Sequence, residues 1–381
     1  MKIGFDAKRA YHNGTGLGHY SRNLIRALAT YYPGNEYFLF TPSITDRFEL
    51  PGDGQVHSET PHSFAAKRLP AFWRSRWVLR DMKRMQIGLY HGLSHEIPLG
   101  IRRTGIKSVV TIHDLIHERF PDQYSRADVL VYRKKFRYAC THADRTIAVS
   151  NQTRQDILDF YGISPEKVVV VYQSINPRFE QVCPPGDLER VRVKYGLPSR
   201  YLLYVGSVIR RKNLLGLCRA LRHLEGSLKL PLVVIGQGRS YRKEVIDFLS
   251  THGMQDRILW LSQGTGPDLR DFPALYQGAI ALVYPSVFEG FGIPILEALW
   301  SRLPVITSTG SCFSETAGEA ALYVDPGRVQ DLAEAIWQVC SDEGLRTRMK
   351  EEGLRQARKF SPAIAAENLM KVYHSLDQTR V

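Results

Sequence analysis

The stretch SVFEGFGIPILEAL at residues 286–299 organises the rest of this chain. It follows an apolar run, residues 279–284, that is typical of a buried strand. Pro294 stands where the first turn of a helix should begin, because the N–H that proline lacks would have no partner there anyway. The pattern therefore predicts a strand, a glycine-containing loop and a helix.

This loop predicts an anion-binding site. The backbone N–H groups of Phe291, Gly292 and Ile293 would gather at a helix N-terminus, where the helix dipole favours a phosphate. Two carboxylates flank them, Glu289 in the loop and Glu297 in what we expect to be the first helical turn. Glu297 could be no more than a partner of the helix dipole. Glu289 lies at the carboxyl end of a strand, where open parallel sheets bind ligands.

Two glutamates separated by seven residues, with Gly-Phe-Gly-x-Pro between them, resemble the signature of the retaining family 4 glycosyltransferases. The resemblance covers nearly the whole chain and implies the α/β GT-B fold, in which two Rossmann-like domains face each other across a cleft. It also implies that Glu289 is catalytic and approaches the donor sugar hydroxyls, and that Glu297 holds the nucleotide ribose. The backbone amides of Phe291, Gly292 and Ile293 would face the donor diphosphate and sugar.

Composition agrees with a sizeable enzyme that has an anionic partner. Of the 381 residues 44% are hydrophobic, enough for two domains. The formal charge of +13 indicates nucleotide phosphates, a phospholipid surface or nucleic acid as partner. The five cysteines form no C-x-x-C pair, which argues against a disulfide framework or zinc site. The chain opens without an apolar signal segment and has no apolar run of ~18–20 residues, so we expect a cytoplasmic protein, soluble or peripheral.

The first half opens like a Rossmann unit, with a strand at residues 2–6 and then a glycine-rich turn. By itself this turn could be a plain tight turn. The resemblance implies that Gly16 matches a glycine near the donor, while Thr15 replaces the other glycine of the family's pair. His113 ends an apolar strand, and the resemblance implies that it contacts the donor sugar near the reaction centre. The alternative is that His113 only caps the strand by hydrogen bonding, and the role of His91 stays open.

The Pro-rich residues 175–186 predict a hinge between domains at 1–176 and 177–360. Ser361 and Pro362 predict the start of a helix, and the resemblance implies that this helix, residues 361–381, packs back on the first domain. Arg211 and Lys212 follow a strand and would meet a diphosphate. The resemblance implies the same role for them.

The resemblance also implies that the nucleotide base lies near residues 262–264. Because Ser262 and Gly264 depart from the family pattern there, the base cannot be read from the sequence.

The implied reaction is transfer of a hexose from a nucleoside-diphosphate sugar with retention. The stretches at residues 90–98 and 111–114 resemble bacterial mannosyltransferases of surface-polysaccharide synthesis, so GDP-mannose is the first donor expected and a UDP-hexose the second. The acceptor would be a glycan or a lipid-linked glycan. Because no Asp-x-Asp motif ends a strand and cations can replace Mg²⁺, we expect no metal and no other cofactor.

Two other classes of protein fit the sequence less well. A nucleotide-sugar epimerase would need carboxylates placed to take a proton from the sugar ring, and none can be identified. A nucleic-acid binder would have no use for two glutamates beside its anion site, so we expect no nucleic acid.

Residues 71–85 predict one basic helix. At about 100° per residue, Val78 and Met82 share an apolar stripe, and Trp73 and Trp77 fall among cations such as Arg80. Interleaved indoles and cations suit the headgroup level of an anionic membrane. We therefore expect this face to dock on the cytoplasmic leaflet. The alternative is that both tryptophans bury against a neighbouring loop.

Overall fold

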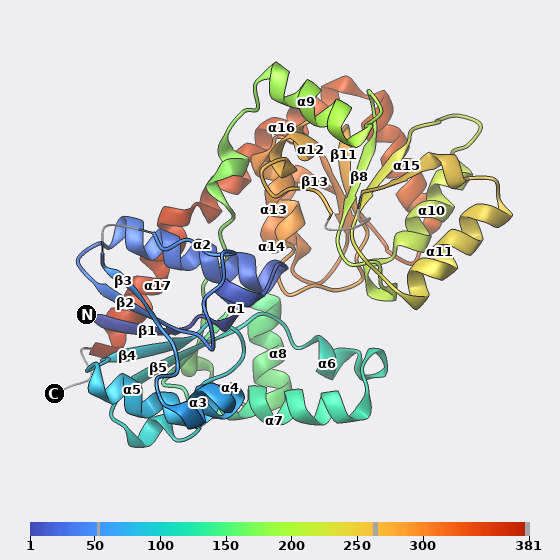
Figure 1. Cartoon of the computed structure of the whole chain (residues 1–381). Coiled ribbons are helices and arrows are strands. Elements are labelled where there is room, and N and C mark those ends of the chain that lie inside the picture. The colour runs from blue at the N-terminus through green and yellow to red at the C-terminus, as the bar shows by residue number, and fades with distance from the viewer. Residues whose placement is uncertain (52–53, 262–265, 378–381) are drawn as a thin grey trace. The chain divides into compact units, whose positions relative to one another are not determined.

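The computed structural model describes residues 1–51, 54–261 and 266–377. The chain divides into two compact units (Figure 1). Unit 1 comprises Met1–Asn176 and Phe360–Val381, and unit 2 comprises Pro177–Lys359. Each unit is a parallel sheet covered by helices, so the predicted α/β class is confirmed for both.

Unit 1 contains a seven-stranded sheet in the order β3-β2-β1-β4-β5-β6-β7, and every neighbouring pair is parallel. Its strands are β1 (Lys2–Asp6), β2 (Glu36–Phe40), β3 (Val56–Glu59), β4 (Leu89–Gly92), β5 (Lys107–Ile112), β6 (Arg145–Ala148) and β7 (Val168–Val170). The central strands β1 and β4 have largely buried side chains on both faces, because helices cover both sides.

The helices of unit 1 form two layers around this sheet (Figure 1). They are α1 (Lys8–His12), α2 (Gly16–Tyr31), α3 (Phe64–Arg68), α4 (Pro70–Phe72), α5 (Val78–Arg84), α6 (Ile116–Arg119), α7 (Arg126–His142), α8 (Asn151–Tyr161) and α17 (Pro362–Asp377). Alternation along β2 separates the layers. Tyr37 and Leu39 pack with α2 and α17, whereas Phe38 and Phe40 pack on the side of α5 and α7.

Unit 2 contains a six-stranded parallel sheet in the order β10-β9-β8-β11-β12-β13. Its strands are β8 (Leu202–Val205), β9 (Leu232–Ile235), β10 (Ile258–Trp260), β11 (Ala281–Tyr284), β12 (Val305–Ser308) and β13 (Ala321–Val324). Its helices are α9 (Pro185–Tyr195), α10 (Leu214–His223), α11 (Ser240–Thr251), α12 (Phe272–Gln277), α13 (Ile293–Trp300), α14 (Phe313–Ala317), α15 (Val329–Ser341) and α16 (Glu343–Ala357). The strand, loop and helix predicted from residues 279–299 are therefore β11, its loop and α13.

Strand order places one reversal in each sheet. In unit 1 the chain runs from β1 outward to β3 and then returns to β4 beside β1. In unit 2 it runs from β8 outward to β10 and then returns to β11 beside β8. Loops that leave the carboxyl ends of two such strands turn away from each other and leave room for a ligand between them. The polar side chains of interest are therefore those that follow β1 and β4, and β8 and β11.

The prediction of one regular helix over residues 71–85 is wrong. Between α4 and α5 the chain winds as a π-helix, Trp73–Trp77, in which the N–H of Val78 reaches the carbonyl of Trp73. This wider turn changes the angular register, so Trp73 points into the core and its Nε1 donates to Asp81 Oδ2 at 2.8 Å. Trp77 is partly buried against the same core. Trp73 is therefore buried, as the alternative expected, and does not face a membrane.

No helix within the described ranges is both long enough and apolar enough to span a bilayer.

Candidate active site

Three cations follow β8 in a short 3-10 turn, Arg210–Lys212. Gly206 leaves the strand with φ +149°, a conformation that suits glycine. A Cβ at Gly236, on the neighbouring strand's loop, would lie 1.8 Å from the Gly206 carbonyl, so these two backbones meet closely. The turn thereby holds Arg211 and Lys212 at the carboxyl end of β8.

Glu289 lies beside these cations, in the loop after β11. Its Oε1 is 2.7 Å from Arg211 Nη1 and 2.6 Å from Lys212 Nζ. The Ser286 hydroxyl donates to the same oxygen at 2.5 Å. Lys212 Nζ also donates to the Tyr284 hydroxyl. The structure thus brings three predicted residues, Arg211, Lys212 and Glu289, into one cluster where the strand order reverses.

The cluster is largely buried and carries a net positive charge. Burial alone would raise the pKa of Glu289, but the charges of Lys212 and Arg211 outweigh burial and hold this pKa below its usual value. Burial and the neighbouring Arg211 lower the pKa of Lys212, against the opposing effect of Glu289. One carboxylate shared by two cations leaves about one positive charge in a poorly solvated place. Such a place favours an anion.

The N-terminus of α13 adds backbone donors beside the cluster. Gly292 precedes the helix with φ +87°, in the left-handed region that suits glycine, and no side chain caps this end. α13 begins at Ile293 and therefore places the Phe291–Ile293 backbone at its first turn, as predicted.

Glu297 lies in the second turn of α13, not in the first turn as predicted. At this distance the helix N-terminus contributes little to the stability of the Glu297 carboxylate. The Tyr276 hydroxyl donates to Glu297 Oε2 at 2.7 Å. Burial raises the pKa of Glu297 to about 7, and the Tyr276 hydrogen bond acts in the opposite direction.

His113 follows β5 in unit 1 and is buried. Its Nε2 donates to the Leu93 carbonyl at 2.9 Å, and its Nδ1 is 3.4 Å from Gln173 Nε2. The Tyr20 ring meets it edge-on, with 4.6 Å between centroids. Burial lowers the pKa of His113 to about 4, the hydrogen bond to Leu93 opposing this and Arg9 adding to it. His113 is therefore neutral near pH 7, with Nδ1 as the acceptor.

His91, whose role the sequence left open, is a structural residue. Its Nδ1 and the Tyr373 hydroxyl of α17 lie 2.6 Å apart, and its Nε2 lies 2.8 Å from Thr111 Oγ1. Burial lowers its pKa to about 3. The neutral ring thus links α17 to β5, and Thr111 continues the chain of hydrogen bonds to Tyr20.

Gly16 is the first residue of α2 and is exposed, and a Cβ there would meet nothing within 4 Å. Packing within unit 1 therefore gives no reason for glycine at this position. Gly18 is different, because a Cβ there would lie 1.9 Å from the Asn13 carbonyl. Gly18, to which the sequence assigned no role, is therefore the position in this turn where a side chain would collide with the backbone.

The structure adds site residues that sequence reasoning missed. Ser286 and Tyr284 orient the cation–carboxylate cluster, and Tyr276 orients Glu297. Ser286 and Tyr284 stand directly before the Glu289 loop, so proximity in sequence was an available signal. Tyr276 lies on another helix, α12, and no local pattern points to it.

Two predicted features have no further structural account. Ser262 and Gly264, expected near the nucleotide base, lie outside the described residues. In the parts of the chain that the structure describes, no group of three His, Cys, Asp or Glu side chains is placed to hold a metal ion. Arg211 and Lys212 supply the positive charge of this cluster.

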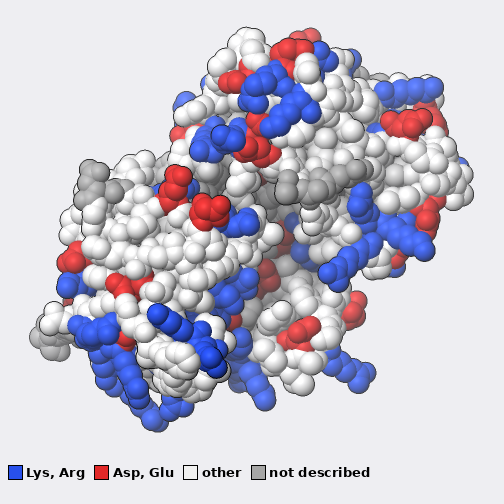
Figure 2. Space-filling view, in the orientation of Figure 1, with Lys and Arg blue, Asp and Glu red and all other residues white. Residues whose placement is uncertain are grey.

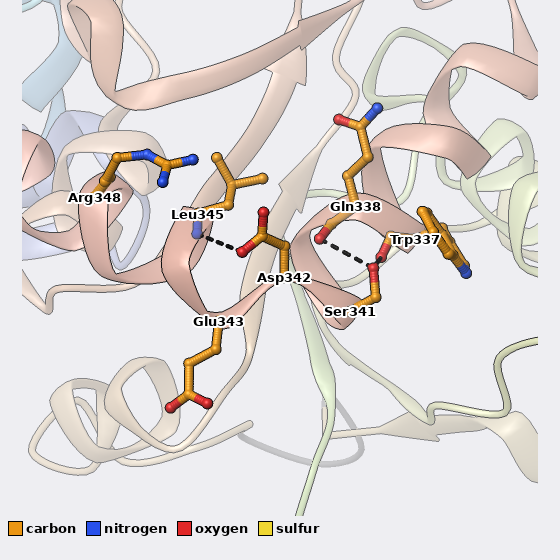
Figure 3. Close-up of a pocket in the computed structure, with 7 residues that line it drawn as sticks. All are labelled: Trp337, Gln338, Ser341, Asp342, Glu343, Leu345 and Arg348. Atoms are coloured by element: carbon orange, nitrogen blue, oxygen red, sulfur yellow. Dashed lines mark hydrogen bonds between the residues drawn. The ribbon is translucent and has the colours of Figure 1, made fainter.

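Unit 2 also has an open pocket between α15 and α16, away from these residues (Figure 3). Its lining is the junction of two helices, where Asp342 Oδ1 caps α16 by accepting from Leu345 N at 2.8 Å. Ser341 donates to the Trp337 carbonyl at 2.8 Å. Its polar groups thus serve the helix ends, and we assign it no ligand.

The fold and the cluster define a class, a two-sheet α/β protein with a buried cationic cluster beyond the strand ends of unit 2. Comparison with known protein families agrees. Residues 189–356 match the family described as glycosyl transferases group 1, and residues 14–179 match glycosyltransferase family 4.

Individual relatives extend this match to the whole chain. The O-antigen chain mannosyltransferase B of Escherichia coli is 30% identical over 382 residues, 95% of this chain and 96% of the relative. The O-antigen chain mannosyltransferase RfbU of Salmonella typhimurium is 29% identical over 245 residues, 64% of this chain and 62% of the relative. The chain therefore belongs to the family 4 glycosyltransferases.

A solved structure confirms the predicted GT-B architecture. Sucrose-phosphate synthase from Thermosynechococcus elongatus superposes over the full length of both chains with a TM-score of 0.76, at 20% sequence identity. At this identity the likeness concerns the fold alone.

Proposed function

We propose that this glycosyltransferase moves a hexose, with mannose favoured, from a nucleoside-diphosphate sugar to a glycan or lipid-linked glycan acceptor in polysaccharide biosynthesis. The anomeric configuration of the sugar would be retained. The observation that carries the proposal is the buried cluster of Arg211, Lys212 and Glu289 between the ends of β8 and β11.

The proposed roles in unit 2 follow from charge and position. Arg211 and Lys212 bind the diphosphate, as does the Phe291–Ile293 backbone at the start of α13. Glu289 orients both cations and accepts hydrogen bonds from the donor sugar. Glu297 accepts hydrogen bonds from the ribose hydroxyls, and Tyr276 holds it in place.

The same groups serve the chemical step. The bond between the anomeric carbon and the β-phosphate oxygen breaks, and negative charge develops on the departing diphosphate. Preorganised cations stabilise such charge more in a buried site than in water. The acceptor oxygen bonds to the anomeric carbon on the same face, and its proton passes to the departing phosphate. This route needs no nucleophile from the protein.

For unit 1 we propose that His113 contacts the donor sugar and that Gly16 lets the backbone approach the donor closely. A neutral His113 suits an uncharged hydroxyl group, which can donate to Nδ1 in place of Gln173. The open surroundings of Gly16 leave space for a ligand at that point.

The choice of donor rests on relatives. Two mannosyltransferases of O-antigen chains share 30% and 29% identity with this chain. GDP-mannose is accordingly the first candidate and a UDP-hexose the second. The experiment is a panel of GDP-mannose, GDP, UDP-glucose, UDP-galactose and UDP, each tested for thermal stabilisation and slow hydrolysis. GDP-mannose should raise the Tm most and should be hydrolysed. Stabilisation by the UDP-sugars alone would exclude GDP-mannose as the donor.

We also propose that transfer needs no metal ion, because Arg211 and Lys212 supply the positive charge. Activity should persist after dialysis against EDTA. A loss of activity that Mg²⁺ or Mn²⁺ restores would contradict this part of the proposal while leaving the donor assignment standing.

A further inference from the structure

Unit 1 exposes large apolar side chains on a short segment that also carries cations. α3 and α4 present three of them to solvent, Phe64 (73% exposed), Leu69 (55%) and Phe72 (45%). The Arg68 guanidinium lies over the Phe64 ring, 4.7 Å from its centroid. The Phe72 ring packs edge-on against the ring of the half-buried Trp77, with 4.7 Å between the ring centroids.

The apolar surface continues onto a neighbouring helix. Leu99 N donates to the Ser75 carbonyl at 2.7 Å, and Gly100 N donates to the Tyr138 hydroxyl of α7 at 2.8 Å. The loop at residues 99–100 therefore ties the π-helix to α7. Leu99 (48% exposed) lies on this connection, and α7 itself exposes Leu130 (55%) and Val131 (47%) nearer its N-terminus.

Cations surround these side chains, and the two carboxylates beside α4 and α5 are already paired. Asp81 is held by Trp73 and Arg84, and Glu96 is held by Arg74 and Lys135. The exposed cations are Lys67, Arg68, Arg76, Arg80, Lys83, Lys134 and Arg137. Figure 2 shows Lys and Arg side chains crowding the part of unit 1 where Figure 1 draws α3, α4 and α5, with uncharged atoms between them.

This local excess agrees with the charge of the whole unit. Unit 1 contains 27 Lys and Arg against 18 Asp and Glu, a formal charge of +9. Unit 2 contains 24 against 20 and carries the remaining +4 of the total of +13. The excess of positive charge is therefore concentrated in the unit that exposes this surface.

We propose that the surface formed by α3, α4, α5 and α7, here called the docking surface, binds a lipid bilayer that contains anionic lipids. Phe64, Leu69 and Phe72 enter the boundary between headgroups and acyl chains, and the surrounding cations pair with lipid phosphates. This assignment replaces the tryptophan-based face that the sequence predicted. It goes beyond the proposed transfer reaction and does not depend on the donor.

Lipid fits the surface better than two other occupants. Single-stranded nucleic acid would use the cations and could stack bases on Phe64 and Phe72, but it would leave the aliphatic Leu69 exposed to water. A second copy of this chain placed face to face would bring the two cationic rims together, which costs free energy. A bilayer satisfies the apolar side chains and the cations at the same time.

The test is co-sedimentation of the full chain with vesicles of phosphatidylcholine alone or of equal parts phosphatidylcholine and phosphatidylglycerol. We expect binding to the anionic vesicles only, and a steep loss of binding as NaCl increases. The apolar variant Phe64→Ser/Leu69→Ser/Phe72→Ser should lose most of its bound fraction. The charge variant Lys67→Gln/Arg68→Gln/Arg76→Gln/Arg80→Gln should lose it as well.

A matched control removes three equally exposed apolar side chains from unit 2, in the variant Val193→Ser/Leu269→Ser/Trp337→Ser. It should bind the vesicles like the wild type, and thermal unfolding should show all variants folded. Failure of the wild type to bind anionic vesicles at low salt would overturn the proposal. So would full binding by the apolar variant, or an equal loss in the control. A dimer in sedimentation equilibrium that the apolar variant dissociates would assign the surface to a second copy instead.

Discussion

Both sheets place buried polar side chains beyond the carboxyl ends of their strands, but these side chains differ in electrostatic character. Where the strand order reverses in unit 2, Arg211, Lys212 and Glu289 form a buried ionic cluster. At the strand ends of unit 1 the buried polar groups are histidines such as His113, whose pKa burial lowers to about 4. The parallel fold provides the position in both cases, and the side chains decide what can bind there.

This difference has a chemical meaning. A buried cluster with surplus positive charge is stabilised by a bound anion. A buried neutral imidazole with a weak 3.4 Å hydrogen bond from Gln173 can exchange that partner for a hydroxyl group. Unit 2 is therefore suited to an anion, such as the diphosphate of the proposed donor, and unit 1 to uncharged hydroxyl groups.

The largest effect is expected from Glu289→Gln. It should abolish transfer, because the amide can no longer orient Arg211 and Lys212 or accept the sugar hydroxyls as a charged group. GDP affinity should stay the same or increase, since the two cations lose their internal partner. Turnover assays together with titration calorimetry measure both effects.

Glu289→Ala serves as the companion variant. It leaves two buried cations unpaired and should lower the free energy of unfolding by about 3–5 kcal/mol. Full transfer activity in folded Glu289→Gln would remove this carboxylate from the reaction.

Lys212→Ala should have the next largest effect, and it tests the ionic side of the comparison. The variant loses a point charge expected on the diphosphate, so GDP should lose more affinity than GMP. The neighbouring Arg210 is the control, because it is exposed and paired with Glu244. Arg210→Ala should leave both affinities near those of the wild type. Equal losses for GDP and GMP in Lys212→Ala would place the diphosphate elsewhere.

His113→Ala tests the neutral side of the comparison. Turnover should fall at least about tenfold, through loss of a contact to the sugar. GDP affinity should change little, because no charge is removed. The exposed histidine variant His12→Ala is the control and should keep full turnover. If His113→Ala lowered GDP affinity as much as Lys212→Ala does, the two groups of side chains would not differ as ionic and neutral binding groups.

Local sequence predicted the parts of the site that depend on a single loop or turn. The glutamates and glycines of residues 286–299 and the cations after β8 are each specified by a strand end and a few following residues. Strand order then brings Arg211, Lys212 and Glu289 together.

The errors have equally local causes. Trp73 was misplaced because a period of 100° per residue does not describe a π-helix. Glu297 was placed in the first turn because α13 begins at Ile293, one residue before Pro294, and helix boundaries cannot be read to the residue. Tyr276 was missed because its contact with Glu297 joins two helices that are distant in sequence.

The smallest effect concerns Glu297 and pH. Its pKa of about 7 in the folded chain lies above the ordinary 4.5, so the folded state holds the extra proton between these values. The stability this carboxyl contributes is therefore present below about pH 4.5 and is lost as the pH rises through about 7, a change of up to about 3 kcal/mol. Glu297→Gln cannot lose that proton and should gain stability relative to the wild type between about pH 5 and pH 8 in urea unfolding. The exposed carboxylate variant Glu319→Gln is the matched control and should follow the wild type.

Donor binding should respond to the same group in the opposite direction. If the Glu297 carboxylate accepts the ribose hydroxyls, GDP affinity in the wild type increases as the pH rises through about 7. GDP itself titrates in this range, so the informative quantity is the ratio of the affinities of wild type and Glu297→Gln. This ratio should increase with pH by several-fold, and Glu319→Gln should show no such change. A ratio that stays constant from about pH 6 to pH 8 would mean that Glu297 does not hold the ribose, and it would leave only the ionic cluster as the donor site of unit 2.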